Sequence, residues 1–388
     1  MSVSNHHGGG LTLQRILGKS LDDISAFIYV DRFANDLPVA EQYAERSVYV
    51  EPIWQSDKVR KAIGNTMAAS LGRKISMVQR YASAAARRID KRFEQGTELL
   101  GLICPQGANS LYTLEGLKAI RPVKYMSWVM DDHLLKYKNG QWEYPRGVEA
   151  VFAKHLREAE HVFVISPVMQ QFYKDRFGIN STVLFGSANP MTDNAVPTIK
   201  ESGPIKIGYF GAVAGWQTDV LQAAGQAITG TDIRLDIYSG VDRLPANLSL
   251  SGIKFKGKVA AADVLKTMQQ YNALLLPISF TEKFRHMSEF NIATKMSESL
   301  ASGVPVVAVG PPYAAMIDYL FKNNAAVIIT SNRHEDILNG LDTLKRGDNL
   351  KNILNNAARL VNSETGDAPM QKRWQQVLDT FKQEATAF

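Results

Sequence analysis

The chain has 388 residues, which is long for a single hydrophobic core and suits two domains of roughly 200 residues or fewer each. Hydrophobic residues make up 45%, charged residues 21% and the net charge is +6, a composition that is typical of globular proteins and excludes a long disordered tail. The sequence contains neither a signal-peptide pattern nor the run of about 18 apolar residues that a membrane-spanning helix needs.

The positive charge is concentrated in one segment. Between Asp57 and Glu94 there are ten basic and three acidic residues, a net charge of +7, so the rest of the chain is close to neutral. This distribution argues against a nucleic-acid-binding protein and indicates one local surface for an anionic partner, for which anionic lipid headgroups are the leading candidate. The single cysteine, Cys104, excludes an intrachain disulfide and a cysteine-based zinc site, and it favours a reducing, cytoplasmic setting.

Short apolar runs alternate with longer helical patterns in the first half of the chain, as in parallel sheets whose strands are joined by helices. The predicted strands of this half are Ile24 to Val30, Ser47 to Val50, Glu98 to Ile103, Tyr125 to Met130, His161 to Ile165 and Thr182 to Phe185. The predicted helices are Leu11 to Lys19, the basic stretch Lys58 to Glu94, Ser110 to Ala119, Val148 to Ala159 and Pro167 to Phe177. In the last of these, Ser166 is the expected N-cap and Gly178 the expected stop.

A stretch rich in Ser, Asn, Pro and Thr, from Gly186 to Gly203, separates this half from a second alternating series. The predicted strands of the second series are Ile205 to Phe210, Ile233 to Tyr238, Ile253 to Phe255, Ala273 to Pro277, Val304 to Val309 and Ala325 to Ile329. A final amphipathic helix is predicted at about Pro369 to Ala385. We therefore divide the chain into an N-terminal domain (1–187), a linker (188–204), a second domain (205–368) and a C-terminal helix (369–388) that packs back on the first domain.

Both series predict an α/β fold of two Rossmann-like, doubly wound domains. Open parallel sheets bind ligands at the carboxyl ends of their strands, so we expect the two domains to face each other across a cleft that holds the active site.

The most specific segment runs from Asn291 to Gly310, where a predicted helix is broken by Gly303 and followed by a buried strand. A helix N-terminus at the cleft holds a diphosphate through free backbone amides and the helix dipole, and Lys295 adds a full positive charge. Glu298, on a nearby face, is placed to accept hydrogen bonds from ribose hydroxyls. An ordinary amphipathic helix with solvated Lys and Glu side chains is the alternative.

The pattern Thr-Lys-x-x-Glu-x-Leu-Ala-x-Gly-x-Pro-Val-Val, from Thr294 to Val307, resembles the donor-site signature of GT-B glycosyltransferases, especially family four and its capsular and exopolysaccharide relatives. The resemblance implies that Glu298 binds the donor ribose, and that Lys295 and the amides near Asn291 and Thr294 bind the diphosphate. It also implies a UDP- or GDP-linked sugar as donor, no metal, no separate cofactor and transfer with retention of configuration.

The same resemblance implies further donor contacts and shows departures. Gly211, in a glycine turn after a predicted strand, corresponds to the turn that faces the donor diphosphate. Relatives carry an arginine and a lysine after this turn, whereas 212–220 contains neither, so we assign that role to Lys283 and Arg285. An acidic residue that many relatives use for the donor sugar is replaced by Phe290, and Glu289 is one position away.

In the first domain the resemblance is carried by scattered motifs. Gly9 and Gly10, before the first predicted helix, are similar to a glycine loop that approaches the donor phosphate, with a flexible tail as the alternative. The segment from Trp128 to His133 is similar to a Met-Asp-Asp-Trp motif of polysaccharide glycosyltransferases. Its polar residues are the predicted catalytic groups, Asp131, Asp132 and His133, which would orient a hydroxyl or accept its proton. Turn formation by the aspartates is the alternative.

The basic stretch contains apolar positions interleaved with arginines, a pattern that is typical of interfacial helices on anionic membranes. Its membrane or acceptor patch is predicted to consist of Arg87, Arg88, Lys91 and Arg92. A solvated helix is the alternative.

Taken together, these features imply a glycosyltransferase that moves a sugar from a nucleotide-diphosphate sugar to a glycan or lipid-linked acceptor. The implied setting is bacterial-type surface polysaccharide synthesis in the cytoplasm, at the inner face of the plasma membrane. A sugar-nucleotide epimerase of the same fold and a non-catalytic binding partner remain as alternatives. A nicotinamide dehydrogenase is disfavoured because no Gly-x-Gly-x-x-Gly follows either leading strand.

Overall fold

A computed structural model describes residues 3–4, 8–30, 39–50, 52, 57–64, 67, 70, 75–190, 204–213, 215–345 and 347–386. The chain forms two compact units. Unit 1 consists of Met1–Leu184 and Trp374–Phe388, and unit 2 consists of Phe185–Arg373. The C-terminal helix α15 (Asp367–Thr386) is thus divided between them, and its residues from Trp374 onward belong to unit 1.

Unit 1 has a four-stranded parallel sheet in the order β3-β4-β7-β8 and a separate parallel pair, β1 with β2. Its strands are β1 (Phe27–Tyr29), β2 (Ser47–Tyr49), β3 (Leu99–Ile103), β4 (Val123–Val129), β5 (Lys136–Lys138), β6 (Gln141–Glu143), β7 (His161–Val164) and β8 (Thr182–Val183). Its helices, besides the end of α15, are α1 (Gly8–Leu17), α2 (Asp57–Ile63), α4 (Ile75–Asp90), α5 (Ala108–Lys118), α6 (Val148–Glu158) and α7 (Pro167–Phe177).

The last part of α15 packs into unit 1 through Trp374. This side chain is 3% exposed, its ring lies 5.6 Å from that of Phe163 on β7, and its indole nitrogen donates to the Ser20 hydroxyl at 3.1 Å. Burial of an aromatic side chain with a satisfied polar end stabilises such a contact by several kcal/mol, on the order of 3. The part of α15 that begins at Trp374 therefore contributes to the core of unit 1.

Unit 2 has one six-stranded parallel sheet in the order β11-β10-β9-β12-β13-β14. Its strands are β9 (Lys206–Phe210), β10 (Arg234–Tyr238), β11 (Ile253–Gly257), β12 (Ala273–Pro277), β13 (Val306–Val309) and β14 (Val327–Ile329). Its helices are α8 (Gly215–Ala227), α9 (Val264–Met268), α10 (Arg285–Ser288), α11 (Thr294–Ala301), α12 (Ala315–Lys322), α13 (His334–Asp342) and α14 (Gly347–Leu360), followed by the first turns of α15. The strand order reverses direction next to β9, which is the expected place for a ligand in a doubly wound sheet.

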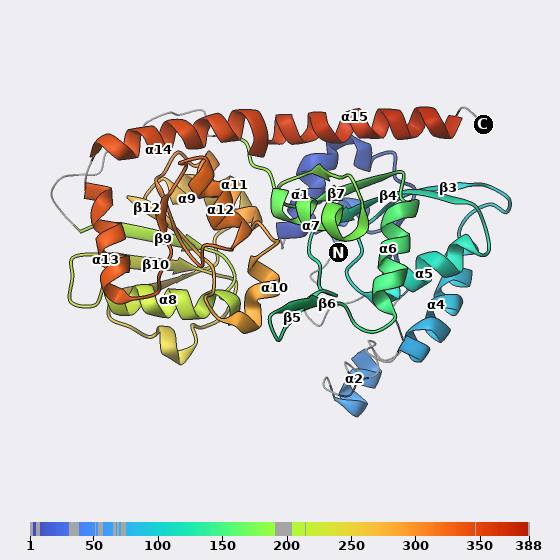
Figure 1. Ribbon diagram of the computed structural model, residues 1–388, viewed down its shortest axis with the longest axis horizontal. Coiled ribbons are helices and arrows are strands. Elements are labelled where there is room, and N and C mark those ends of the chain that lie inside the picture. Colours follow the sequence, from blue (N-terminus) through green and yellow to red (C-terminus); the bar gives the residue numbers. More distant parts are fainter. Residues whose placement is uncertain are drawn as a thin grey trace. The chain divides into compact units, whose positions relative to one another are not determined.

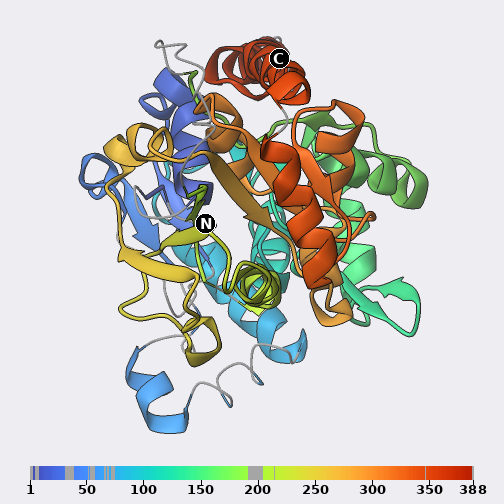
Figure 2. The ribbon, with the colours of Figure 1, turned by 90° about the vertical axis from the view of Figure 1, so that its left-hand side faces the viewer.

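Helices cover both faces of the unit 2 sheet (Figure 1; Figure 2, where α8 is seen end-on). One face packs against α8 and α13, and β12 and β13 are fully buried between the layers. The other face packs against α9, whose Val264 and Met268 contact Phe210 and Leu274. Strands buried on both faces must be apolar along their whole length, which explains the continuous hydrophobic runs in the sequence.

Three details of the elements differ from the sequence-based expectations. In the described part of the stretch predicted as one helix from Lys58 to Glu94, the structure has α2 and α4, and Gly64, with φ of 76°, follows the end of α2. Helix α1 begins at Gly8, so the glycines expected in a loop form its first turn. A hairpin, β5 with β6, was not predicted; its turn residues Asn139 and Gly140 both have positive φ.

Helix α4 has its apolar face buried within unit 1. Ala82, Ala85, Ala86 and Ile89 are at most 3% exposed, and a Cβ atom on Gly116 of α5 would lie 3.1 Å from Ala86 Cβ. The expectation that apolar side chains of this stretch insert into lipid is therefore wrong for α4, because the close α4–α5 packing already removes them from solvent.

Within the described residues, no helix combines the length and the apolar character that crossing a bilayer requires.

Candidate functional site

The N-terminus of α11 lies at the carboxyl edge of the unit 2 sheet. Strands β12 and β13 are parallel neighbours, so the helix that connects them must start at the edge where β12 ends. The N-cap residue, Ala293, makes no side-chain capping hydrogen bond, and its carbonyl oxygen accepts from the Met296 amide at 2.9 Å. This end of the helix carries partial positive charge that favours an anion.

Lys295 and Glu298 lie side by side in the first turns of α11. Lys295 Nζ is 2.8 Å from Glu298 Oε2, and the two side chains are 33% and 7% exposed. The structure thus brings together the two residues that the sequence analysis assigned to diphosphate and ribose. A buried carboxylate beside a half-exposed ammonium group combines an acceptor for hydroxyl groups with a donor for phosphate oxygens.

Asn291 and Thr294 precede and begin the same helix. Asn291 is 8% exposed, and its side-chain carbonyl oxygen Oδ1 has no hydrogen-bond partner among the described residues. Thr294 packs against Gly186, where a Cβ atom would lie 2.8 Å from Thr294 Cα, and the Ser297 hydroxyl donates to the Gly186 carbonyl oxygen. One side of the first turn is therefore covered by unit 2 itself, which only glycine at position 186 permits.

The loop after β12 carries the predicted basic residues in two different environments. The Arg285 guanidinium forms an ion pair with Glu289 and lies 4.4 Å from the ring centroid of Tyr313. Lys283 is exposed, its Nζ lies 5.6 Å from the ring centroid of Phe284, and it forms no ion pair with the part of the chain that the structure describes. Glu289 is thus held by Arg285, and the structure leaves Lys283 as the more available cation.

The turn after β9 is shaped by packing. The Gly211 amide donates to the Tyr238 carbonyl oxygen at 3.0 Å, and a Cβ atom on Gly211 would lie 2.7 Å from the Tyr209 hydroxyl oxygen. The Gly211 amide is therefore already hydrogen-bonded to a neighbouring strand. A side chain at position 211 would collide with Tyr209, which explains why this residue is glycine. Any phosphate contact in this turn falls to the residues that follow.

Asp219, on α8, was missed by the sequence analysis. Its Oδ2 accepts hydrogen bonds from the Ser279 hydroxyl at 2.7 Å, the Phe280 amide at 3.2 Å and the Thr281 hydroxyl at 3.3 Å. These contacts attach the start of the loop after β12 to α8, and the same loop contains Lys283. No local pattern in the sequence indicates them, because the partners are about sixty positions apart.

In unit 1, Asp132 is a structural residue of the turn after β4. Its Oδ1 accepts from the amides of Leu134 and Leu135, and its Oδ2 accepts from the hydroxyls of Tyr144 at 2.6 Å and Tyr173 at 2.9 Å. Burial raises the pKa of the Asp132 carboxyl, and these hydrogen bonds limit the rise. These four hydrogen bonds hold the carboxylate in the turn, and its catalytic role stays a prediction.

Asp131 and His133 flank this anchored residue and are half-buried. Burial, together with the neighbouring Asp132, raises the pKa of the Asp131 carboxyl to about 7. A carboxyl group that titrates near neutral pH is suited to take up or release a proton during a reaction. Of the three predicted catalytic residues, Asp131 therefore has the properties that fit the role best.

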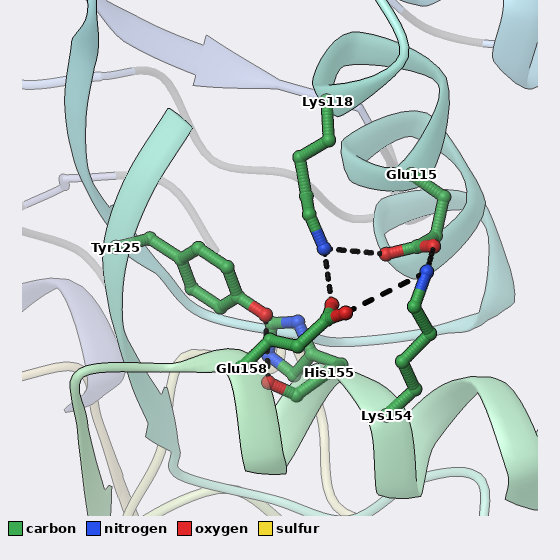
Figure 3. Close-up of polar contacts among 6 residues, drawn as sticks. All are labelled: Glu115, Lys118, Tyr125, Lys154, His155 and Glu158. Atoms are coloured by element: carbon green, nitrogen blue, oxygen red, sulfur yellow. Dashed lines mark hydrogen bonds and ion pairs between the residues drawn. The ribbon is translucent and has the colours of Figure 1, made fainter. Parts of the chain in front are cut away.

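A second group of titratable side chains joins α5 to α6 in unit 1 (Figure 3). Lys118 bonds to both Glu115 and Glu158, and Lys154 bonds to Glu115. His155, 1% exposed, lies behind them and pairs its Nε2 with the Ser127 hydroxyl at 2.8 Å. Burial lowers the pKa of the His155 imidazole to about 3, so we interpret it as a neutral core histidine.

The remaining predicted site residues belong to unit 1. Gly9 and Gly10 are helical, in the first turn of α1. Arg87 and Arg88 are exposed in the last turn of α4, and Lys91 and Arg92 are exposed directly after it. The residues that the structure describes include no group of three or more His, Cys, Asp or Glu side chains placed to hold a metal ion.

No protein-family model matches the chain, and no curated protein matches its sequence. Solved structures do match its fold. A sucrose-phosphate synthase from Thermosynechococcus elongatus is 13% identical with a TM-score of 0.65, over 99% of this chain and 96% of that protein. A glycosyltransferase from Rickettsia africae is 12% identical with a TM-score of 0.61, over 96% and 95%. HepE from Anabaena, solved with UDP and glucose, is 14% identical with a TM-score of 0.59, over 97% and 98%.

These similarities extend over nearly the whole of both chains in each comparison, so they concern the two-unit architecture and not one sheet alone. At such low identity they establish the fold: two Rossmann-like units of the GT-B type, as the sequence predicted. A shared fold does not by itself carry a shared reaction.

Proposed function

We propose that the protein is a glycosyltransferase that moves a sugar from a nucleotide-diphosphate sugar to a glycan or lipid-linked acceptor. The observation that carries the proposal is the pairing of Lys295 with buried Glu298 at the uncapped N-terminus of α11, at the carboxyl edge of a doubly wound sheet. One matched structure is a glycosyltransferase and another was solved with UDP and glucose, and both support the same interpretation.

In the proposed reaction the helix dipole of α11 and the Lys295 ammonium stabilise the leaving diphosphate, and Glu298 accepts hydrogen bonds from the ribose hydroxyls. The interactions of the helix dipole and of Lys295 strengthen as negative charge develops on the leaving oxygen, which is the condition for lowering the barrier, whereas the ribose contact of Glu298 contributes to binding of the donor. Transfer with retention would then proceed by attack of the acceptor hydroxyl on the face that the diphosphate leaves.

Asp131 is proposed as the unit 1 residue that binds the acceptor hydroxyl and accepts its proton, in a turn that Asp132 keeps in place. His133 is proposed to contact a sugar hydroxyl. The exposed basic patch of Arg87, Arg88, Lys91 and Arg92 is proposed to hold the protein at an anionic membrane, as a lipid-linked acceptor of surface polysaccharide synthesis would require.

A panel of UDP-, GDP- and dTDP-sugars, screened by thermal shift and then assayed for transfer, tests the proposal. A ligand at about 100 times its Kd stabilises the folded protein by about 2.7 kcal/mol, which is easily seen as a rise in Tm. We expect one nucleotide series to raise Tm, and a donor from that series to be consumed when an acceptor is present. A protein that binds no nucleotide sugar would be a non-catalytic binding partner.

A sugar-nucleotide epimerase of the same fold is the second candidate. The observation that favours it is the near-neutral pKa of Asp131, because epimerisation needs groups that exchange a proton at one sugar carbon. The two candidates are separated by omitting the acceptor: an epimerase would still convert its sugar nucleotide, whereas a transferase would at most hydrolyse it slowly.

A further inference from the structure

The turn after β9 and the first turn of α8 contain no positive charge of their own. The segment 212–220 has no Lys or Arg, and its charged residue is Asp219. A diphosphate bound beside this strand end carries at least two negative charges, and backbone dipoles alone offset only part of them. The balancing cation therefore has to reach this strand end from another element.

The loop after β12 is attached to α8 mainly through one carboxylate, that of Asp219. Asp219 Oδ2 accepts three hydrogen bonds from consecutive residues of that loop, the shortest from the Ser279 hydroxyl at 2.7 Å. Ser279 is itself 1% exposed, and its amide donates to the Trp216 carbonyl oxygen at 3.1 Å. The loop is thus tied to the first turns of α8 by both its side chains and its backbone.

After these bonded residues, the loop also contacts the first residue of α8. A Cβ atom on Gly215, the first residue of α8, would lie 2.9 Å from the Phe284 ring, so the ring rests directly on this glycine. Lys283 Nζ lies 5.6 Å from the centroid of the same ring. The ammonium group therefore lies near the start of α8, where the segment lacks a cation.

Two basic residues are present in this loop, but their charges are used differently. Arg285 is ion-paired with Glu289 and stacked on Tyr313. Lys283 is exposed and has no carboxylate partner in the described part of the chain. An unpaired ammonium group is the better ligand for a phosphate, because no existing ion pair has to be broken.

We propose that Asp219 is a positioning residue that fixes the segment from Ser279 to Phe284 on α8, and that Lys283 thereby supplies the positive charge for the donor diphosphate at the start of α8. This proposal rests on the proposed function, since it assigns a part of the donor to residues of this loop. It predicts that an acidic residue, which would by itself repel phosphate, promotes diphosphate binding through the lysine it positions.

Calorimetric titration with UDP, GDP and dTDP, and with the corresponding nucleosides, tests the role of Lys283. We expect Lys283→Ala to weaken the best-bound diphosphate by about 10- to 100-fold and to leave binding of the matching nucleoside unchanged. Lys283→Arg should retain most of the affinity. The matched control is Lys322→Ala, which removes an exposed lysine from α12 and should change neither.

The role of Asp219 is tested by comparing the losses of affinity in the single variants with the loss in the double variant. Asp219→Asn should weaken diphosphate but not nucleoside binding, and the double variant with Lys283→Ala should bind no more weakly than Lys283→Ala alone. Ser279→Ala, which removes the shortest of the three bonds, provides a second and milder variant if Asp219→Asn does not fold. Adding Gln217→Lys to Lys283→Ala returns a charge to α8 itself and should restore part of the affinity.

The outcomes separate this inference from the proposed function. A wild-type protein that binds none of UDP, GDP and dTDP overturns both. Nucleotide binding that is unchanged in Lys283→Ala, or a loss that is equally large for the nucleoside, overturns the assignment of Lys283 and leaves the proposed function standing. Strictly additive losses in the double variant overturn the positioning role of Asp219.

Discussion

Lys295 Nζ lies 2.8 Å from Glu298 Oε2, and the carboxylate of this pair is buried while the ammonium group is half-exposed. The two residues have opposite charge and are proposed to contact different parts of the donor. Because each side chain also holds the other in place, removal of either one has a direct effect on the ligand and an indirect effect on its partner. The first two predictions separate these effects.

Lys295→Met is expected to weaken binding of the nucleoside diphosphate about 10- to 100-fold, because a charge-assisted contact to phosphate is worth about 1.5–3 kcal/mol. The loss should shrink as salt is added, and the affinity for the bare nucleoside should change little. Isothermal titration at two ionic strengths measures both effects. A variant that loses nucleoside and diphosphate affinity equally would show that Lys295 acts only by orienting Glu298.

Glu298→Ala is expected to weaken nucleotide binding by a similar factor, since a buried carboxylate that accepts hydroxyl hydrogen bonds is lost. The decisive comparison uses the 2′,3′-dideoxy nucleotide. If Glu298 binds the ribose, wild-type protein prefers the ribose form and Glu298→Ala no longer distinguishes the two. A preference that survives in Glu298→Ala would place the ribose contact elsewhere on unit 2.

Asp131→Asn is expected to reduce kcat about 100-fold or more, as loss of a general base does. Burial and the adjacent Asp132 raise the pKa of Asp131 to about 7, so the group is ionised above this pH and protonated below it. If it acts as a base, kcat/KM of the wild type rises with pH through about 7 and then levels off. In Asp131→Asn this limb should be absent from the pH profile.

Asp132→Asn is the matched comparison for Asp131. It removes the neighbouring charge that helps to raise the pKa of Asp131, so the limb of the kcat/KM profile should move to lower pH without disappearing. It also weakens the bonds to Tyr144 and Tyr173, which should lower Tm. The contrary result is an Asp132→Asn protein that keeps the Tm of the wild type and loses the limb of the kcat/KM profile. That result would assign the role of general base to Asp132 and the structural role to Asp131.

Much of the fold could be predicted from the sequence because central strands such as β12 and β13 are buried on both faces. The run from Ala273 to Pro277 was predicted with both ends correct, and the Ser166 cap and Gly178 stop of α7 are confirmed by a hydrogen bond from the Met169 amide and a left-handed glycine. These signals are local: apolar runs, caps and stops are written in consecutive residues. The Asn139–Gly140 turn is equally local, and a search for hairpin dipeptides would have found β5 and β6.

The site was less predictable because its decisive contacts are not local. The Lys295–Glu298 pair was accessible since both residues share one helix, at a spacing of three. The bonds of Asp219 to Ser279 and of Asp132 to Tyr173 join residues that meet only when the sheet is assembled. Sequence alone therefore placed Asp132 among the catalytic residues, whereas its four hydrogen bonds hold a turn.

Stability is expected to fall as pH decreases below about 6.5, in part through His155. Burial lowers the pKa of this histidine to about 3 in the folded protein, so between about pH 6.5 and 3 the unfolded chain binds a proton that the folded protein excludes. This difference costs up to about 1.4 kcal/mol for each pH unit below 6.5. His155→Gln, which keeps a polar partner for Ser127 but does not titrate, should flatten the dependence of Tm on pH between about 6.5 and 5.

The control for this prediction is His334→Gln, because His334 is exposed on α13. Its Tm profile should follow that of the wild type. A His155→Gln protein with the same slope as the wild type would mean that His155 takes up its proton in the folded state, which its buried bond to Ser127 argues against.

The last prediction concerns the basic patch on α4. Reversal of Arg87, Arg88, Lys91 and Arg92 to Glu should release the protein from vesicles that contain phosphatidylglycerol, since each basic residue near an anionic surface contributes about 1 kcal/mol. Cosedimentation with these vesicles, and with neutral phosphatidylcholine vesicles, measures the effect. Because the apolar face of α4 packs inside unit 1, insertion of this face does not add to the attraction, and we expect salt alone to release the wild type as well.

A control of equal charge change decides whether the patch or the total charge matters. The exposed lysines chosen for reversal lie on or beside β11 and on α12: Lys254, Lys256, Lys258 and Lys322. This variant should remain on anionic vesicles if the α4 patch is the docking surface. If both variants are released equally, the total charge of the protein and not the patch determines binding. If wild-type binding resists high salt, it depends on an apolar contact that the buried face of α4 does not provide.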